Sequence, residues 1–453
     1  MVAVVAALVL HLDAKSRVEA IASDALQMDV TVGQRPEIGF LPSLHIALGD
    51  VHVRNHGAEV ATAGEVDLRI ELMPLLHHEI RIEKVALKRL ALTIERDPAG
   101  RLNIDRSSTT PGSFPPLAIT TASVSDASLS IVDKQSGRRL ELTGCTLDVS
   151  RLQFSSGPGA AFLPSLSLAA KGICGQIRTT DVTVSDVRFS VAGENGVLDA
   201  DPVTMRLFGG QGSGTVRADL TGAAPVYHVR YRLTQFRIEE FFKTVSPKSI
   251  GQGPMDFSAD LSLRGTTTDA LIRTSVGEAS LHGANLKLYI GDVDKASSRY
   301  KASQKFNLVD VAAVFFAGPL GLGVTKGYDF ARIFQGTGES TTVRTLISEW
   351  QVEHGVAEAK DVAMATPENR VALKGRLDFV TGRFEDVTVA IVNAKGCPEV
   401  QQKVRGSFLK PVVEEPNVVA TLTGPTRTLV RQAKKLFGGK CDVFYTGSVA
   451  PPQ

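Results

Sequence analysis

The stretch Val66–Asp105, VDLRIELMPLLHHEIRIEKVALKRLALTIERDPAGRLNID, decides the fold. In its first part, apolar and charged residues alternate, with the apolar positions at Val66, Leu68, Ile70 and Leu72. The chain then turns at Pro74-Leu75-Leu76, and the alternation resumes at Ile80 and Ile82. A period of two residues predicts a strand on each side of this corner, with one apolar face and one charged face.

After the corner, the apolar positions change parity twice. They pass from Ile82 to Val85 and Leu87, and then to Leu90, Leu92 and Ile94. We therefore expect a bulge or tight turn at Glu83-Lys84 and another at Lys88-Arg89. Each one keeps the same face of the sheet apolar while the sheet bends.

The composition indicates a large folded protein and argues against nucleic acid as its partner. With 453 residues and 43% hydrophobic content, the chain can bury one large or two medium cores. The formal net charge is only +2, and no basic stripe with interleaved aromatic residues is present. Aromatic residues make up 6%, so the apolar face consists mainly of aliphatic side chains.

Strand patterns continue along the rest of the chain. Short apolar alternations recur from Leu117 to Leu233 at intervals of about ten residues, which is the spacing of successive hairpins. A Pro/Ser-rich break at 107–116 is interpreted as a surface loop. A helical period appears at Ile238, Phe241, Phe242 and Val245. We predict a mostly β protein: an elongated, curved antiparallel sheet that forms an open groove, with a few short helices.

Two segments resemble the AsmA-like family of Gram-negative bacteria. The first is the apolar run Leu72–Leu76, followed by E-I-x-I-x-x-V-x-L at Glu79–Leu87 and by a strand and turn from Leu90 to Asn103. The second, Ser258–Leu288, reads as a strand, a short helix and a strand, and it is the more specific match. The short sequence segments that begin at Gly375 and Gly406 look like C-terminal strands of the same family.

The resemblance implies a protein with a single N-terminal anchor in the bacterial inner membrane and its bulk in the periplasm. Val2–Leu10 is purely apolar but covers only about half of the roughly 20 residues that a membrane-spanning helix needs. We interpret residues 1–12 as the remainder of an anchor; a cleaved signal and a short apolar strand are the alternatives. Residues 13–235 are then a β-groove region and residues 236–453 a C-terminal region with short helices and strands.

An amphipathic helix is expected directly after the anchor. Asp13–Leu26 places Val18, Ile21, Ala22 and Ala25 on one stripe, the spacing of a helix that leaves a membrane.

The four cysteines fit no metal-ligand spacing. Because the resemblance places the chain in an oxidising compartment, we expect a disulfide between Cys397 and Cys441. Cys145 and Cys174 lie in strand-like stretches and are expected to be buried free thiols.

Catalytic and metal-binding patterns were sought without success. His77 and His78 are adjacent and point to opposite sides of a strand, with no third ligand at a useful spacing. The glycine-rich stretches 209–214 and 318–327 lack the Lys-Ser/Thr of a phosphate-binding loop. We therefore expect a protein that is not an enzyme and that has no cofactor.

The function depends on what covers the apolar face. No sequence-adjacent helix is long enough to cover it, and a bare face of this size exceeds what a soluble monomer normally exposes. The family resemblance implies outer-membrane biogenesis and phospholipid transfer, so the occupant is expected to be phospholipid acyl chains. The residues expected to line this groove are Leu68, Ile70, Ile80, Ile82, Val85, Leu87, Leu90, Leu92 and Ile94.

A different class of function remains open. The protein can instead be a scaffold that assists outer-membrane protein assembly by pairing an exposed edge strand with client strands, or a regulator of membrane composition that carries no lipid. Outer-membrane or other periplasmic proteins would then be its partners.

One further helix, Asp310–Ala317, is apolar on every side. It is expected either to contact membrane or plug one end of the groove, or to be buried in the C-terminal core. The candidate membrane-contact residues are Val311, Val314, Phe315 and Phe316.

Overall fold

The structure is a computed structural model, and it divides into two compact units. Unit 1 comprises Met1–Leu207 and Ser213–Pro225, and unit 2 comprises Phe208–Gly212 and Val226–Gln453. The sequence had placed the second region from residue 236 onward. The residues that the structure describes are 15–40, 43–76, 81–105, 118–153, 162–245, 250–289, 292–294, 315, 340–408, 410–414, 417–418 and 441–452.

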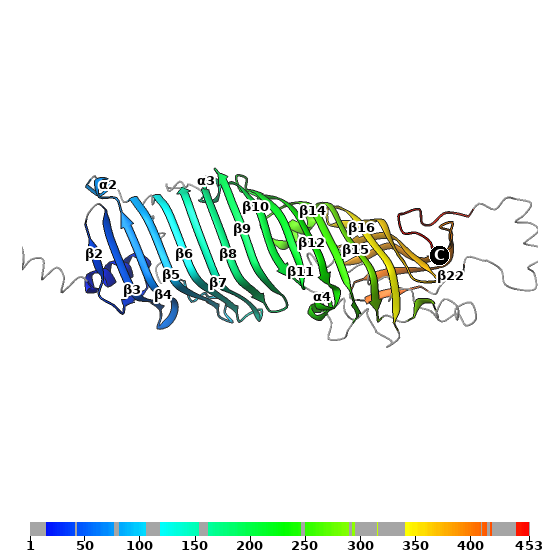
Figure 1. Ribbon diagram of the computed structural model, residues 1–453, viewed down its shortest axis with the longest axis horizontal. Helices are drawn as coiled ribbons and strands as arrows, with labels where there is room; N and C mark the ends of the chain where they lie inside the picture. Colours follow the sequence, from blue (N-terminus) through cyan, green and yellow to red (C-terminus); the bar gives the residue numbers. More distant parts are fainter. Residues whose placement is uncertain are drawn as a thin grey trace, which may run out of the picture. The chain divides into compact units, whose positions relative to one another are not determined.

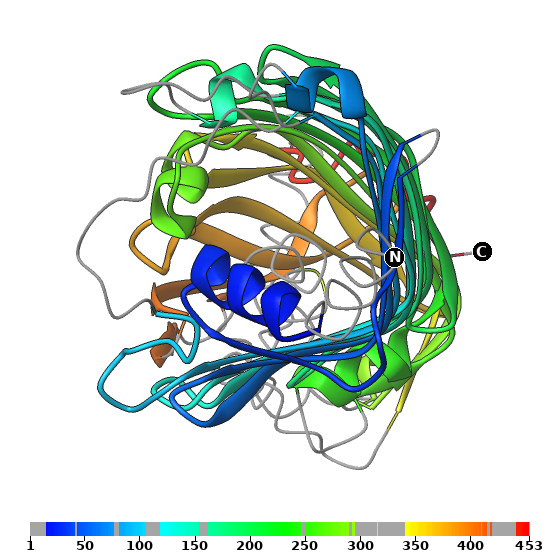
Figure 2. The same cartoon turned by 90° about the vertical axis from the view of Figure 1, so that its left-hand side faces the viewer.

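Unit 1 is a curved sheet with a helix over residues 15–26 (Figures 1 and 2). Its elements, in chain order, are β1 (Asp29–Val32), β2 (Glu37–Gly39), β3 (Leu44–Asn55), β4 (Ala58–Ile70), α2 (Leu72–Leu76), β5 (Arg81–Arg96), β6 (Ala118–Asp133), β7 (Arg138–Gln153), α3 (Phe162–Ser165), β8 (Ser167–Thr179), β9 (Thr183–Glu194) and β10 (Val197–Leu207). The strand β11 (Gly210–Asp219) contributes residues to both units.

The strands of unit 1 pair in chain order from β3 to β10, while β1 and β2 both pair with β3. The prediction of a purely antiparallel sheet was wrong at one pair. β5 and β6 run parallel, from Arg81 beside Ala118 to Arg96 beside Asp133, so the sheet is mixed. A parallel neighbour requires the chain to return to the start of β5 before the next strand begins.

Both expected changes of parity occur in β5, the first through the predicted bulge and the second without a bulge. Between Ile82 and Lys84 the register against β4 shifts by one residue, which places a bulge at Glu83. Arg89 has a φ of 51°, the left-handed conformation that reverses the alternation of side chains without a register shift.

Other strands repeat this positive-φ feature, and it forms a line across the sheet that we call the crease. Asp50 in β3 lies opposite Gly64 in β4, and Gly64 lies opposite Arg89 in β5. In each case the residues before and after them are register partners. The same line continues through neighbouring strands. The crease residues with positive φ are Asp50, Arg89, Asp126, Gly144 and Asp186.

Unit 2 is an antiparallel sheet. Its elements are β12 (Val226–Arg237), α4 (Ile238–Val245), β13 (Gly251–Gln252), β14 (Pro254–Arg264), α5 (Thr268–Thr274), β15 (Val276–Leu288), β16 (Thr341–Glu353), β17 (Val356–Ala365), β18 (Arg370–Asp378), β19 (Arg383–Val392), β20 (Pro398–Ser407), β21 (Lys410–Val413) and β22 (Asn417–Val418). β12 pairs with β14, the strands from β14 to β20 pair in chain order, and β13, β21 and β22 are short additions.

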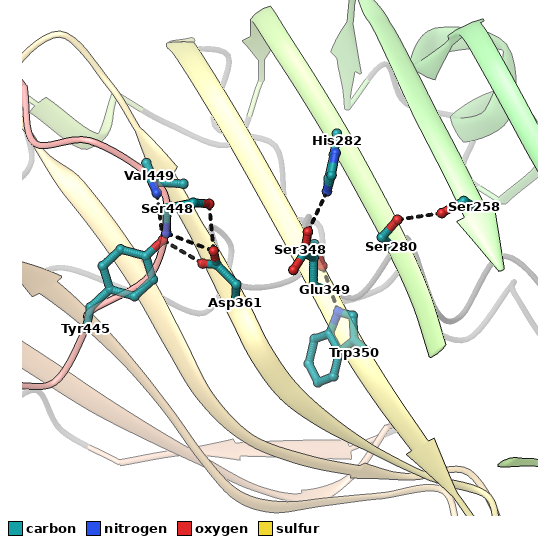
Figure 3. A network of polar contacts seen from close by, with 10 residues as sticks. All are labelled: Ser258, Ser280, His282, Ser348, Glu349, Trp350, Asp361, Tyr445, Ser448 and Val449. Atoms are coloured by element: carbon teal, nitrogen blue, oxygen red, sulfur yellow. Dashed lines mark hydrogen bonds and ion pairs between the residues drawn. The ribbon is translucent and has the colours of Figure 1, made fainter. Parts of the chain in front are cut away.

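Both faces of the unit 2 sheet carry buried residues. One face contains Met364, Val371 and Ile391, which are register partners and are at most 2% exposed. On the same face Ser348 accepts a hydrogen bond from the Trp350 indole (Figure 3). The Ser348 hydroxyl group also donates one to the Phe315 carbonyl. Unit 2 therefore has a closed hydrophobic core.

The opposite face of unit 2 is covered by the C-terminal segment, residues 441–452. Tyr445 and Val449 pack against a shelf of small side chains formed by Ala363, Ala365, Ala372, Ala390 and Val392. Asp361 accepts hydrogen bonds from Tyr445 and Ser448 (Figure 3). Arg370 donates to the Val449 carbonyl at 2.9 Å, so both ends of the contact are fixed by polar groups.

Two disulfides are present. Cys397 is joined to Cys441, which attaches the C-terminal segment to the start of β20, and the Cα atoms are 5.9 Å apart. Cys145 is joined to Cys174, so the expectation that these two were free thiols was wrong. The physical reason is the strand register, which places them directly opposite each other in β7 and β8.

Candidate functional site

The apolar face of unit 1 is built from rows of side chains that cross the sheet from strand to strand. Register partners on neighbouring strands point to the same face, so each row can be followed along the pairing. The first row is Ile46, Leu68, Val85, Ala122, Val149, Ala170, Val191 and Ala200. The second row is Leu48, Val66, Leu87, Val124, Leu147, Gly172, Phe189 and Val203.

A third row lies beyond the crease. Its members are Val53, Ala61, Leu92, Leu129, Leu142, Ile177, Val184 and Leu207. The crease keeps this row on the same face as the other two, because Leu48, Val66 and Leu90 all pack around one cluster that also contacts Val53. The three rows together form a continuous aliphatic surface from β3 to β10, which we call the apolar lane.

The apolar lane is only partly covered. Leu87, Leu92 and Leu129 are half-buried, whereas core residues of unit 2 such as Leu377 and Val389 are 0% exposed. A sheet face in this state offers aliphatic contact to something outside unit 1.

The apolar lane lies on the concave side of the sheet. The N-terminal helix (residues 15–26) packs against the lane through Ala22, and Figure 2 shows this helix inside the curve of the strands. The expectation that no neighbouring helix covers the face was therefore wrong for its first part, over β3, β4 and the adjacent side of β5. Of the stripe predicted for this helix, Ala22 faces the sheet, whereas Ile21 is 71% exposed.

The other face of the unit 1 sheet is charged. Glu65 in β4 accepts hydrogen bonds from Lys88 at 2.7 Å and from Arg89 at 3.1 Å, and these bonds lower the pKa of its carboxyl group. Farther along, Lys134 pairs with Glu95 at 2.7 Å and Arg217 with Asp199 at 3.0 Å. Water solvates this face, so the two sides of the sheet differ sharply in polarity.

Asn103, the last residue of the first family motif, holds the turn after β5 against that strand. Its side-chain amide donates to the Thr93 carbonyl, and its side-chain oxygen accepts from the Glu95 amide. Asn55 at the end of β3 donates in turn to the carbonyls of Asn103 and Asp105. The motif thus closes the edge of the sheet beside the third row.

The structure brings the described groove candidates together on one face. Leu68, Val85, Leu87 and Leu92 belong to the three rows, Ile70 and Ile82 are register partners of each other, and Leu90 and Ile94 share the parity of Leu92. Ile80 lies outside the described residues. The continuation of the lane through β6–β10 was not predicted from the sequence. The alternation at Leu129 and Ile131, and at Leu140 and Leu142, is the signal that could have revealed it.

The candidate membrane-contact residues fall mostly outside the described part of the chain. Val311, Val314 and Phe316 are not described. Phe315 is 0% exposed in unit 2, and its carbonyl accepts the hydrogen bond from Ser348. The burial of Phe315 fits the alternative of a core position, while membrane contact by the other three residues stays a prediction.

The described residues show neither a membrane span nor a metal site. Within that part of the chain, no helix has both the length and the apolar character needed to cross a membrane. The same residues contain no group of three or more His, Cys, Asp or Glu side chains placed to hold a metal ion. The run Val2–Leu10 and the pair His77-His78 lie outside it.

The fold and the lane define a class of protein: a large, open, mixed β-sheet with few short helices that presents a continuous aliphatic concave face. The model of the AsmA family matches residues 1–156 and 166–320, more than half of the chain. The chain belongs to the AsmA family. The match ends at residue 320, before the sequence segments that begin at Gly375 and Gly406. Searches of curated proteins and of solved structures found no match.

Proposed function

We propose that the apolar lane of unit 1 binds phospholipid acyl chains, and that the protein serves outer-membrane biogenesis as a noncatalytic carrier or conduit of phospholipid. One observation carries this proposal: three rows of almost entirely aliphatic residues run from β3 to β10, and most of their side chains are only partly buried. Membership of the AsmA family is consistent with such a role.

The chemistry of the lane favours acyl chains over other ligands. Its side chains are almost all Leu, Val, Ile and Ala, and Phe189 is the only aromatic residue in the three rows. Aliphatic surface gains free energy from burial of CH₂ groups, about 0.8 kcal/mol for each, without requiring a polar partner. The charged opposite face would remain in water, as expected for a sheet in the periplasm with an inner-membrane anchor near residues 1–12.

Photo-crosslinking tests the proposal directly. Crosslinking amino acids at Leu92 and Ile94 should capture phospholipid in cells, because both side chains lie on the lane face. The matched controls, Thr93 and Glu95, alternate with them on the same strand and point to the other face. Capture of protein alone, or equal lipid capture on both faces, would contradict lipid binding.

The alternative function, a scaffold that adds client strands to a sheet edge, is disfavoured at the β1 edge. The amides of Val30 and Val32 donate to Ser23 Oγ at 2.9 Å and to Glu19 Oε1 at 2.8 Å. These donors are therefore not available to pair with an added strand. Capture of client protein at Leu92 instead of lipid would favour the scaffold.

A further inference from the structure

The N-terminal helix, residues 15–26, occupies part of the apolar lane. Ala22 packs on a buried cluster of Val30, Val32, Val51 and Ala63. The same cluster contacts Leu48 and Val66, which belong to the second row of the lane. The surface under the helix and the rest of the lane are thus one continuous apolar surface. Among the described residues, a helix covers only its first end.

The helix makes few apolar contacts with this surface. Ala22 is the only residue of the helix that packs on the cluster, and it offers a single methyl group. Val18 is half-buried, but two of the larger apolar side chains point into solvent, with Ile21 71% exposed and Leu26 43% exposed. An acyl chain laid on the same surface would bury more aliphatic area than Ala22 does.

Two hydrogen bonds hold the helix in place. Glu19 and Ser23 are four residues apart, on one side of the helix, and accept from the amides of Val32 and Val30 in β1. Lys15 lies 4.0 Å from Glu19 and adds an exposed ion pair, a weak contribution. A helix of this length is marginal in water without packing, so its position depends on these few contacts.

We propose that the acyl-chain site continues under the helix, and that the helix is a displaceable cover that competes with phospholipid for this surface. The inference rests on the proposed function of the lane. It assigns Val51, Ala63 and Val66 to the lipid site, and it makes Glu19 and Ser23 the residues that set how readily lipid enters the first end.

The test compares lipid capture at a covered position and at an open one in the full-length, membrane-embedded protein. A photo-crosslinking residue replaces either Val66, under the helix, or Leu129, in the open third row. Each probe is combined with Glu19→Ala and Ser23→Ala together, which remove both hydrogen bonds while raising helix propensity. Asp24→Ala is the matched control, because Asp24 is exposed on the same helix and its carboxylate has no hydrogen bond or ion pair with the described residues.

Lipid should be captured at Leu129 in every background. Capture at Val66 should rise roughly tenfold in the double variant, because two hydrogen bonds that hold the helix are lost. It should not rise in the Asp24→Ala control. Amides of residues 15–26 should also exchange hydrogen faster in the double variant. Equal capture at Val66 in all backgrounds, or none at Val66 in the double variant while Leu129 captures lipid, would overturn the inference alone. Absence of lipid at Leu129 would overturn the proposed function together with it.

Discussion

The hydroxyl group of Tyr445 donates a 2.6 Å hydrogen bond to Oδ1 of Asp361, across 84 positions of the chain. The other carboxylate oxygen of Asp361 accepts from both the amide and the hydroxyl group of Ser448, at 2.8 and 2.6 Å. One carboxylate in β17 therefore fixes the C-terminal segment on the alanine shelf. Charge-assisted bonds of this kind are stronger than neutral ones, so the contact depends on the ionisation of Asp361.

The stability contributed by Asp361 should depend on pH. Burial raises its pKa, but the hydrogen bonds from Ser448 and Tyr445 outweigh burial, and the net pKa lies below the ordinary carboxyl value. The contribution is therefore complete above the unfolded-state pKa and is lost as the pH falls through the folded-state pKa. Asp361→Asn should cost about 1–3 kcal/mol of unfolding free energy at neutral pH and progressively less in acid.

Thermal unfolding of the wild type and Asp361→Asn across the acid range measures this difference. Glu358→Gln is the control, since Glu358 is an exposed carboxylate on the same strand that pairs with Lys360; it should change stability little at any pH. If Asp361→Asn lowered the unfolding free energy by the same amount at every pH, the charge of Asp361 would not be what holds the C-terminal segment.

Two glycines in the sheets should respond very differently to alanine. Gly277 in β15 has a φ of 144°, and a Cβ there would collide with the backbone carbonyl of Asp260. Gly64 in the crease has no positive φ, and a Cβ would meet the guanidinium end of Arg89, a flexible and 56% exposed side chain. Gly277→Ala should therefore destabilise its unit by about 1–3 kcal/mol, and Gly64→Ala by much less. Calorimetry measures both variants, and equal losses of stability in Gly277→Ala and Gly64→Ala would contradict this prediction.

The disulfide between Cys145 and Cys174 should stabilise unit 1. It links β7 to β8 across a separation of 29 residues, so the chain-entropy estimate of its contribution is about 3–4 kcal/mol. The double change to alanine should lower the melting temperature, and denatured, unreduced wild-type protein should show no labelled thiol at either position. Labelling of Cys145 and Cys174 in protein from an oxidising compartment would show that this bond does not form.

The sequence predicted the features of the fold that depend on local alternation. The parity changes at Glu83-Lys84 and Lys88-Arg89 could be located because a buried or half-buried face must stay apolar. The helix at Ile238–Val245 was recognised by its period and is confirmed. The helix Thr268–Thr274, which follows the Thr267 N-cap, was indicated by the family resemblance.

The remaining features depend on pairing, which alternation does not encode. A period of two residues is the same in parallel and antiparallel strands, so the parallel partnership of β5 with β6 could not be read from it. The Cys145–Cys174 bond required the register of β7 against β8. The stripe on residues 15–26 predicted an amphipathic helix, but the choice of Ala22 rather than Ile21 as the packed residue came from tertiary contacts.

A charge placed in the apolar lane should block lipid binding. Leu92 is half-buried and lies between Ala61 and Leu129 in the third row, so an aspartate there would keep contact with water and should lower stability only modestly. The same aspartate would interrupt the aliphatic surface and would have to be desolvated by any acyl chain that passes over it. Leu92→Asp should therefore abolish most phospholipid binding by the purified, folded protein.

Thr93→Asp is the matched control for Leu92→Asp, because it adds the same charge one residue away on the opposite face of β5. Binding of a fluorescent phospholipid and the melting temperature should be measured for both variants. We expect similar melting temperatures and loss of lipid binding only for Leu92→Asp, since only that charge meets the acyl chain. Equal binding by the two variants would mean that lipid does not lie along the third row.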